Sequence, residues 1–360
     1  MHKEFLMGNA AIALGAVAAG VNVVAGYPGT PSTEVLETIA KHRPDDVYVE
    51  WSVNEKAAME LAAGASYAGA RSMVTMKQVG LNVASDPLMS LEYVGIKGGM
   101  VILVADDPGP ISSQTEQDTR HFSRFSKLPC FDPSSAQEAY EMIQEAFEYS
   151  EKYGTPVFLR PTTRVCHGYA SIMVKDETEY THHQPEGFIK DSKRWVIFPR
   201  LSFMNHKKIE ARNQELSDIF SSYEKNTIHP SCDAFKDSKK GIATGGISYT
   251  YTMETLKKTG MVKTLKIATP HPFPEKLAVD FLSGLDEVLC LEELDPVIER
   301  ELIYICGKYH LPTRINGKLS GHTACAGENT RDSISNYIHT FLGLDTSKAQ
   351  ELPDPPALPV

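Results

Sequence analysis

A single glutamate, Glu55, stands where a short apolar stretch gives way to a run of small residues. Residues 47–51 (VYVEW) have the composition of a strand, and residues 55–69 carry alanines at the spacing of a closely packed helix. A carboxyl group in such apolar, partly desolvated surroundings can exchange a proton with a bound ligand. Ser52 and Glu55 also have the spacing of a capping box, in which the glutamate only accepts the N–H of the cap residue. Around Glu55 alone, both interpretations stay open.

Three polar stretches that contain glycine each follow a predicted strand: 27–33 (YPGTPST), 77–82 (KQVGLN) and 106–120 (DDPGPISSQTEQDTR). Ligand sites of parallel sheets lie beyond the carboxyl ends of the strands, so we expect these three loops to converge near Glu55. The first loop also suits a simple turn that leads into a Ser or Thr helix cap. It is not a Walker loop, because no lysine follows its glycine, and the chain contains no G-x-G-x-x-G.

Strand-like and helix-like segments alternate over about the first 165 residues. Alternation of this kind, with apolar strands, predicts an α/β domain in which helices cover both faces of a parallel sheet. Ser135 and Glu138 form an expected helix start. The predicted strands are 21–25, 47–51, 72–76, 100–105 and 156–160, and the predicted helices are 9–19, 32–42, 55–69 and 134–153.

The periodicity fails between about residues 175 and 237, where charge is scattered around an isolated helix near 206–225. Residues 241–249 (GIATGGISY) then end a strand and open a helix, and further strand–helix units follow. The chain therefore divides into four predicted parts: an α/β domain at 1–175, a connector at 176–237, a smaller α/β domain at 238–345 and a proline-rich tail at 346–360.

Composition excludes some classes of protein. The 36 basic and 46 acidic residues argue against a nucleic-acid surface. Six dispersed cysteines without a C-x-x-C indicate reduced thiols in a cytoplasmic protein, with no metal or iron–sulfur site in this chain. The apolar stretch after Met1 superficially copies a signal peptide, but it is rich in alanine and glycine. It is also too polar and too interrupted for a membrane span, so we expect a helix and a strand of the domain there.

Seven segments together resemble the alpha subunits of indolepyruvate ferredoxin oxidoreductases, in the 2-oxoacid:ferredoxin oxidoreductase superfamily, over nearly the whole chain: YPGTPST, VEWSVNEKAA, TMKQVGLNVASDPL, ADDPGPISSQTEQDTRHF, RPTTRVCHG, GIATGGISY and LCLEELDPVIE. The resemblance implies that the first domain is the pyrimidine-binding domain of a thiamine diphosphate enzyme. It implies a transketolase-C-terminal-like fold for the second domain. Such enzymes oxidatively decarboxylate a 2-oxoacid, pass the electrons to [4Fe–4S] clusters and ferredoxin, and transfer the acyl group to coenzyme A.

The resemblance also assigns roles to residues. Glu55 would be catalytic, holding N1′ of the aminopyrimidine of thiamine diphosphate, with cofactor contacts from Lys77, Gly80 and Asn82. Thr30 would contact the substrate, and Arg120 would pair with the carboxylate of the 2-oxoacid, a role suited to bidentate geometry. Arg124 is the rival for that carboxylate, and a surface arginine without a role is the third interpretation. The remaining substrate contacts would come from Gln78 and Ile111.

The chain also departs from the family pattern. It has no G-D-G with a downstream asparagine to hold Mg²⁺ and diphosphate, so we expect it to be inactive without partners. The expected partners are a diphosphate-binding subunit, a gamma-type subunit and a ferredoxin-like iron–sulfur subunit, with ferredoxin or a similar acceptor. Gln78 and Ile111 replace two histidines of the family loops. This favours an aromatic or branched 2-oxoacid, of the indolepyruvate, phenylpyruvate or phenylglyoxylate type, over 2-oxoglutarate.

Two alternatives remain open from the sequence. The chain could belong to a non-oxidative thiamine diphosphate decarboxylase or carboligase, which would lack electron carriers in its partner subunits. It could also be a non-catalytic scaffold subunit, an interpretation that the presence of Glu55 weakens.

Overall fold

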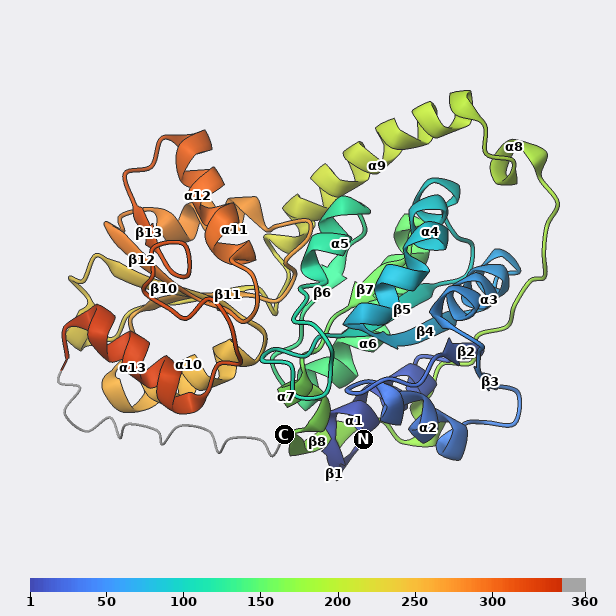
Figure 1. Cartoon of the computed structure of the whole chain (residues 1–360), viewed down its shortest axis with the longest axis horizontal. Helices are drawn as coiled ribbons and strands as arrows, with labels where there is room; N and C mark the ends of the chain where they lie inside the picture. The colour runs from blue at the N-terminus through green and yellow to red at the C-terminus, as the bar shows by residue number, and fades with distance from the viewer. Residues whose placement is uncertain (345–360) are drawn as a thin grey trace.

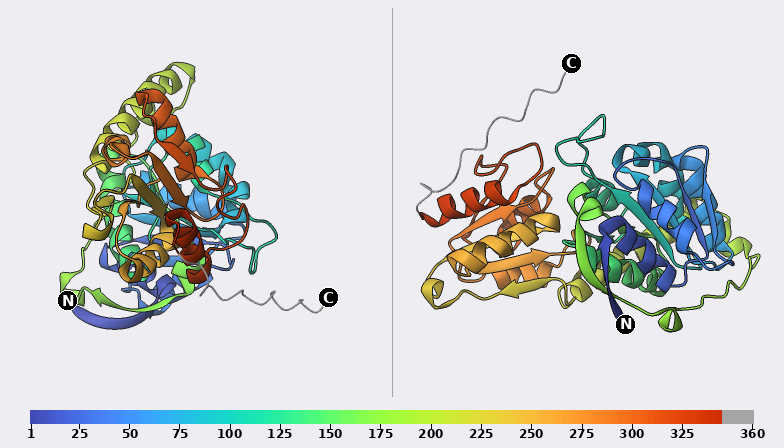
Figure 2. Two further views of the ribbon diagram at one scale, coloured as in Figure 1. Left: turned by 90° about the vertical axis from the view of Figure 1, so that its left-hand side faces the viewer. Right: turned by 90° about the horizontal axis from the view of Figure 1, so that it is seen from below.

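The computed structural model describes residues 1–344, and the predicted tail at 346–360 lies outside them. Two α/β bodies lie side by side, joined by a connector that includes one long helix (Figure 1). The view from below separates the two sheets clearly (Figure 2). Within residues 1–344, none of the helices combines the length and the apolar character needed to cross a membrane.

The first body contains a six-stranded parallel sheet in the order β3-β2-β4-β5-β7-β6. Its central strand β5 is buried at every residue, as an apolar strand covered on both faces should be. The parallel α/β prediction is therefore confirmed. The strands are β2 Val23–Gly26, β3 Tyr48–Trp51, β4 Ser72–Lys77, β5 Met100–Ala105, β6 Cys130–Phe131 and β7 Val157–Leu159.

Successive side chains of these strands point to opposite faces and enter two separate cores. Met73 packs under α1, α2 and α6 on one face, whereas Val74 packs under α3 and α4 on the other. The helices of this body are α1 Gly8–Ala18, α2 Thr33–His42, α3 Glu55–Tyr67, α4 Gln78–Val94, α5 Arg120–Phe125, α6 Ala136–Tyr153 and α7 Thr163–His167. Ser135 caps α6 as expected, accepting the N–H of Glu138.

Two local predictions were wrong. Residues 78–94 form the helix α4 rather than a loop and an irregular stretch, although Gly80 and Pro87 lie inside it. Burial decides the matter, because the apolar face formed by Leu81, Ala84, Leu88 and Leu91 has helical spacing and packs on the sheet. The chain also begins with a strand that was not predicted: β1 His2–Met7 pairs antiparallel with β8 Tyr169–Val174.

The second body contains a five-stranded sheet in the order β13-β12-β10-β11-β9, in which only β9 is antiparallel. Because β9 falls within the predicted connector, the second domain begins earlier in the chain than residue 238. Its strands are β9 Thr227–His229, β10 Lys240–Gly245, β11 Lys263–Ile267, β12 Glu287–Leu291 and β13 Arg314–Asn316. Its helices are α10 Gly246–Thr259, α11 Glu275–Leu282, α12 Val297–Tyr309 and α13 Arg331–Leu342.

The connector contains two short turns, η1 Glu177–Glu179 and η2 Asp233–Phe235, and two helices, α8 Ser192–Trp195 and α9 Pro199–Phe220. The predicted helix is therefore present but begins earlier, at a proline that suits a first helical turn. The helix α9 is anchored deeply only from its middle onward, through Ile209, Leu216 and Phe220. Its first half runs along the outside of the first body (Figure 1).

Candidate active site

Four connections meet at the carboxyl ends of the central strands of the first body. The loop 27–32 follows β2, the start of α3 follows β3, α4 follows β4, and the loop 106–119 follows β5. In an open parallel sheet this is the edge at which ligands bind. The predicted convergence of these segments is confirmed.

Glu55 is the first residue of α3, and it does not cap the helix. Asn54 is the cap, and its side-chain oxygen accepts the N–H of Ala57 at 2.9 Å. The capping-box interpretation of Glu55 is therefore wrong. Glu55 is 8% exposed, beside the buried Ala58 and Met59. Its carboxylate takes part in none of the hydrogen bonds found within residues 1–344, so it is free to serve a ligand.

The carboxylate of Glu55 lies directly over Gly80 in the first turn of α4. A Cβ atom added at Gly80 would stand 2.5 Å from Oε1 and 2.7 Å from Cγ of Glu55. Any side chain at this position would therefore displace the glutamate. The helices α3 and α4 thus approach closely at the point where α4 has no side chain and α3 presents a carboxylate.

Lys77, the last residue of β4, contacts both the loop that follows β2 and the loop that follows β5. A Cβ atom at Gly29 would lie 3.0 Å from Cγ and Cδ of Lys77, so the loop 27–32 packs on the stem of the lysine. Its Nζ reaches Oε1 of Gln114, in the loop 106–119, at 3.4 Å. Thr30 is exposed beside Gly29, on the open side of the loop. A cation and a hydroxyl group are therefore available at this edge.

Two side chains of α4 hold the loop 106–119. Gln78 is fully buried and donates to the carbonyl of Thr115 at 3.2 Å, while Asn82 donates to Gln117 Oε1 at 3.1 Å. The other amide atom of Gln78, Oε1, is buried without a hydrogen-bond partner among residues 1–344. A buried acceptor of this kind requires a donor. Ile111, on the same loop, is exposed.

Arg120 lies in the seam between the two bodies with its donors already paired, so our prediction that it binds a substrate carboxylate is wrong. It is almost completely buried, and its guanidinium group donates to Asp118 at 2.5 Å and to Glu292 at 2.8 Å. The backbone carbonyls of Glu293 and Asp295 also accept hydrogen bonds from this guanidinium group. With its donors occupied in this way, Arg120 ties the first body to the loop after β12.

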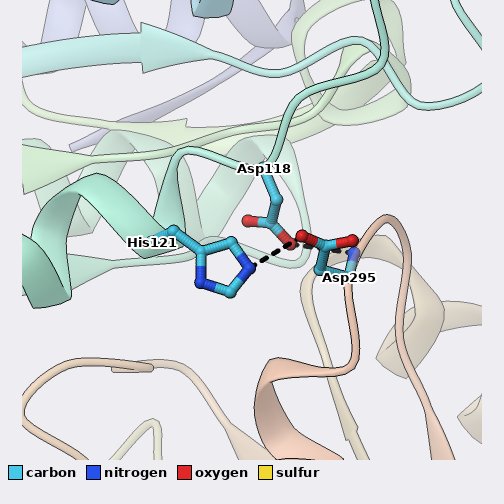
Figure 3. Close-up of side chains that lie close together, drawn as sticks. All are labelled: Asp118, His121 and Asp295. Carbon is cyan, nitrogen blue, oxygen red and sulfur yellow. Dashed lines mark hydrogen bonds and ion pairs between the residues drawn. The ribbon is translucent and has the colours of Figure 1, made fainter. Parts of the chain in front are cut away.

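Neighbouring groups extend the seam. His121 contacts the carboxylate of Asp295 at 2.7 Å, and Asp118 accepts the backbone N–H of Asp295 at 3.0 Å (Figure 3). These three side chains are close enough to suggest a metal site, but both oxygens of Asp118 already accept from Arg120. Arg124, the rival of Arg120, is exposed and pairs with Glu301 of the second body.

The seam also contains carboxyl groups that the sequence analysis did not single out. Burial raises the pKa of Glu293 to about 7, although it accepts the N–H of Asn329 at 3.0 Å. Burial likewise raises the pKa of Asp106 to about 6, against the opposing effect of Arg160 at 2.6 Å. The available signal was the Glu-Glu pair directly after the buried strand β12. Asp106 is held within the first body by Thr119 and Arg160, and Glu293 is held within the second by Asn329.

Comparison with known proteins agrees with this geometry. Residues 14–229 match the family described as pyruvate flavodoxin/ferredoxin oxidoreductase, thiamine diphosphate-binding. The chain belongs to this family. It is 40% identical over 363 residues to the indolepyruvate oxidoreductase subunit IorA of Methanothermobacter thermautotrophicus, a match that covers 99% of this chain and 57% of the relative. It is 39% identical to the IorA of Pyrococcus abyssi, covering 99% and 57%. The chain thus spans little more than half the length of these relatives.

Solved structures support the fold. A 2-oxoglutarate:ferredoxin oxidoreductase from Magnetococcus marinus superimposes with a TM-score of 0.73 at 18% identity, covering 94% of this chain and 65% of that one. A split-gene transketolase superimposes with a TM-score of 0.58 at 14% identity, covering 94% and 97%. The predicted pyrimidine-binding domain with a transketolase-like second domain is therefore confirmed.

The family implies thiamine diphosphate, and the residues present fit one end of that cofactor. Glu55 offers a carboxylate that has no hydrogen-bond partner among residues 1–344, and Gly80 has no side chain to displace that carboxylate. The same fit does not extend to the diphosphate end, because the chain has no G-D-G motif for Mg²⁺.

Proposed function

We propose that this chain supplies the pyrimidine-binding half of a thiamine diphosphate-dependent 2-oxoacid:ferredoxin oxidoreductase. The observation that carries the proposal is the carboxylate of Glu55, which lies over Gly80 at the carboxyl edge of the sheet and has no hydrogen-bond partner among residues 1–344. A second polypeptide segment supplies the diphosphate and Mg²⁺ contacts. When bound, the cofactor supplies the carbanion chemistry needed to decarboxylate a 2-oxoacid.

The residues of this chain bind and orient. Glu55, which is almost completely buried, holds a proton at N1′ of the aminopyrimidine. Lys77 and Asn82 fix the loop 106–119 over α4, which closes the cofactor edge. Thr30 and Gln78 contact the substrate, since both lie on segments that end at this edge. Ile111 contributes an apolar contact once the second segment covers it.

We place the substrate among aromatic or branched 2-oxoacids. Relatives named as indolepyruvate oxidoreductase subunits support the aromatic members of this class, whereas a relative named as a 2-oxoglutarate synthase subunit matches only half of the chain. A relative named as a ketoisovalerate oxidoreductase subunit, whose name gives a branched 2-oxoacid, matches 89% of the chain at 24% identity. Ile111 and Gln78 offer an apolar group and a neutral amide, rather than a cation, to the part of the substrate beyond its keto carbon.

The partners follow from the same proposal. The complex contains the diphosphate-binding segment, a gamma-type subunit and an iron–sulfur subunit that delivers electrons to ferredoxin or a similar acceptor, and coenzyme A receives the acyl group. The six cysteines, all within the described residues, are unpaired, which suits a cytoplasmic protein. A non-oxidative decarboxylase or a scaffold would differ by having no electron carriers in the complex.

Calorimetry tests the proposal. The chain alone should bind thiamine diphosphate and Mg²⁺ weakly, and the diphosphate-binding segment added in trans should restore tight binding. The reconstituted complex should then reduce a viologen dye with a 2-oxoacid and coenzyme A. Tight, Mg²⁺-dependent binding by this chain alone would show that its cofactor site is complete and that our division of the site is wrong.

A further inference from the structure

Residues 188–204 expose an unusual concentration of large apolar side chains. Each of them is between 40% and 60% exposed, and together they form a surface that we call the α8–α9 patch: Phe188, Ile189, Val196, Ile197, Phe198, Phe203 and Met204. Scattered exposed apolar residues are normal, but a concentration of this kind within one short segment marks a contact with another molecule.

The same segment is strongly basic in an acidic chain. Residues 187–208 contain six lysines and arginines and one aspartate, a net charge of +5, whereas the whole chain carries −10. The rest of the chain therefore carries −15. Among the cations, Lys193, Arg200 and Lys207 are exposed around the apolar side chains. A segment that exposes both apolar side chains and cations complements a surface that offers apolar groups and carboxylates.

The patch is held in place by the first body. Trp195 packs on Tyr67 with ring centroids 4.9 Å apart, and Arg194 donates to the carbonyl of Ile96 at 2.6 Å while it stacks on Trp195. Asn205 donates to the carbonyl of Tyr93 at 2.8 Å. A surface fixed in this way loses little conformational entropy when it binds.

The patch lies away from the cofactor edge. Tyr67 ends the helix that Glu55 begins, and a helix of 13 residues is about 20 Å long. Figure 1 shows α8 and the first half of α9 beside the ends of α3 and α4 that lie farthest from the loops of the site. A segment that completes the site at Glu55 therefore does not have to reach the patch.

We infer that the α8–α9 patch docks an acidic protein subunit of the enzyme complex, other than the segment that completes the cofactor site. Phenylalanine and methionine are among the residues enriched in protein interfaces, and they make up four of the seven residues of the patch. A symmetric contact with a second copy would set +5 against +5. A flat anionic membrane would be repelled by the −15 carried by the rest of the chain. The inference rests on the proposed function only in placing the partner within the same complex.

The test uses the tagged chain co-expressed with its partner subunits. One variant, Phe203→Ser with Met204→Ser, removes apolar contacts, and a second, Arg200→Glu with Lys207→Glu, reverses charge. Ile303→Ser with Tyr304→Ser is the matched control, because this pair is equally exposed on a helix of the second body. Native mass spectrometry of each purified complex gives the subunit composition, and thiamine diphosphate content is measured on the same samples.

We expect both patch variants to lose one subunit that the wild type and the control retain, with thiamine diphosphate content unchanged. That subunit, purified, should bind the wild-type chain with a dissociation constant that rises at least about tenfold in the charge-reversal variant. Its affinity should fall as salt increases. Unchanged composition in both variants would overturn the inference. So would binding of the wild-type chain to phosphatidylglycerol vesicles, or self-association, that the serine variant abolishes. Loss of thiamine diphosphate from every complex, wild type included, would count against the proposed function instead.

Discussion

The carboxylate of Glu55 rests on the bare backbone of Gly80, in the position that a side chain on α4 would occupy. The two residues come from helices that pack against each other: α3, which follows β3, and α4, which follows β4. This contact lets a charged group sit at a closely packed helix–helix approach. It also makes the position of the glutamate sensitive to a single methyl group.

We predict that Gly80→Ala will remove most of the activity of the reconstituted complex. The new Cβ would stand 2.5 Å from Oε1 of Glu55, so the carboxylate must move away from the cofactor edge. Displacements of about 1 Å at a catalytic group cost on the order of a hundredfold in rate. Gly64→Ala in α3 is the control, because a Cβ there meets no atom within 4 Å. It should keep full activity and stabilise the helix by about 0.5–1 kcal/mol. Equal activity of the two variants would contradict the role of the contact.

Glu55→Gln should abolish turnover while leaving the fold intact. The amide keeps the shape of the side chain but cannot exchange the carboxyl proton at N1′. Asn54→Ala should instead lower stability and keep activity. It removes the helix cap at a cost of about 1 kcal/mol and leaves the carboxylate in place. Urea denaturation and steady-state kinetics of both variants separate the two roles. If Glu55→Gln retains activity within a few-fold, the glutamate is not catalytic.

Periodicity was enough to predict most of the first body. The buried strand β5 and the amphipathic helix α6 followed directly from their apolar spacing. The helix α4 was missed because Gly80 and Pro87 disfavour a helix locally, and packing of one face on the sheet overrides that preference. The strand β1 was missed because its partner, β8, is far away in the chain and has no signal of its own.

The candidate site likewise contains residues that the sequence could predict and one that it could not. Glu55 and the loops beyond the strands could be predicted, because local motifs mark them. Arg120 could not, because its partner Glu292 lies 172 residues later and no local pattern connects them. A conspicuous arginine in a polar loop therefore suggested substrate binding, whereas the folded chain uses it between the domains.

Arg120→Met should destabilise the chain strongly. The substitution leaves Asp118 and Glu292 as buried charges without their partner, which costs on the order of 3–5 kcal/mol. Because these contacts join the two bodies, we also expect unfolding to split into two transitions. Arg124→Ala removes an exposed pair and should cost less than about 1 kcal/mol. Calorimetric melts decide the matter: normal stability with a raised KM in Arg120→Met would restore the substrate-binding interpretation.

The seam should make stability depend on pH through Glu293. Its pKa is raised to about 7 in the folded chain, so the folded state holds a proton that the unfolded state has released above its ordinary pKa. The stability present at low pH is therefore lost as pH rises through about 7, by at most about 1.4 kcal/mol per pH unit. Glu293→Gln keeps an acceptor for the N–H of Asn329 and removes this titration. Melting curves recorded from pH 5 to 8 should show the stability of the variant rising relative to that of the wild type as pH rises. The same pH dependence of stability in both proteins would contradict the assignment.

The last prediction concerns Oε1 of Gln78, which is buried without a hydrogen-bond partner in the part of the chain that the structure describes. If this atom accepts a hydrogen bond from the substrate, Gln78→Leu should raise KM for a substrate with a ring N–H or hydroxyl, and should do so more than for phenylpyruvate. The lost hydrogen bond corresponds to about 1–3 kcal/mol, or roughly 10- to 150-fold. Because Gln78 also donates to the loop at Thr115, Asn82→Ala serves as the control, since it removes another contact of the same loop.

Ile111→His tests the apolar contact and should weaken selection against polar 2-oxoacids. The measurement is a panel of 2-oxoacids assayed with coenzyme A and a viologen acceptor. A preference for 2-oxoglutarate in the wild type, or the same proportional change for all substrates in Gln78→Leu, would remove the basis for assigning Gln78 to the substrate.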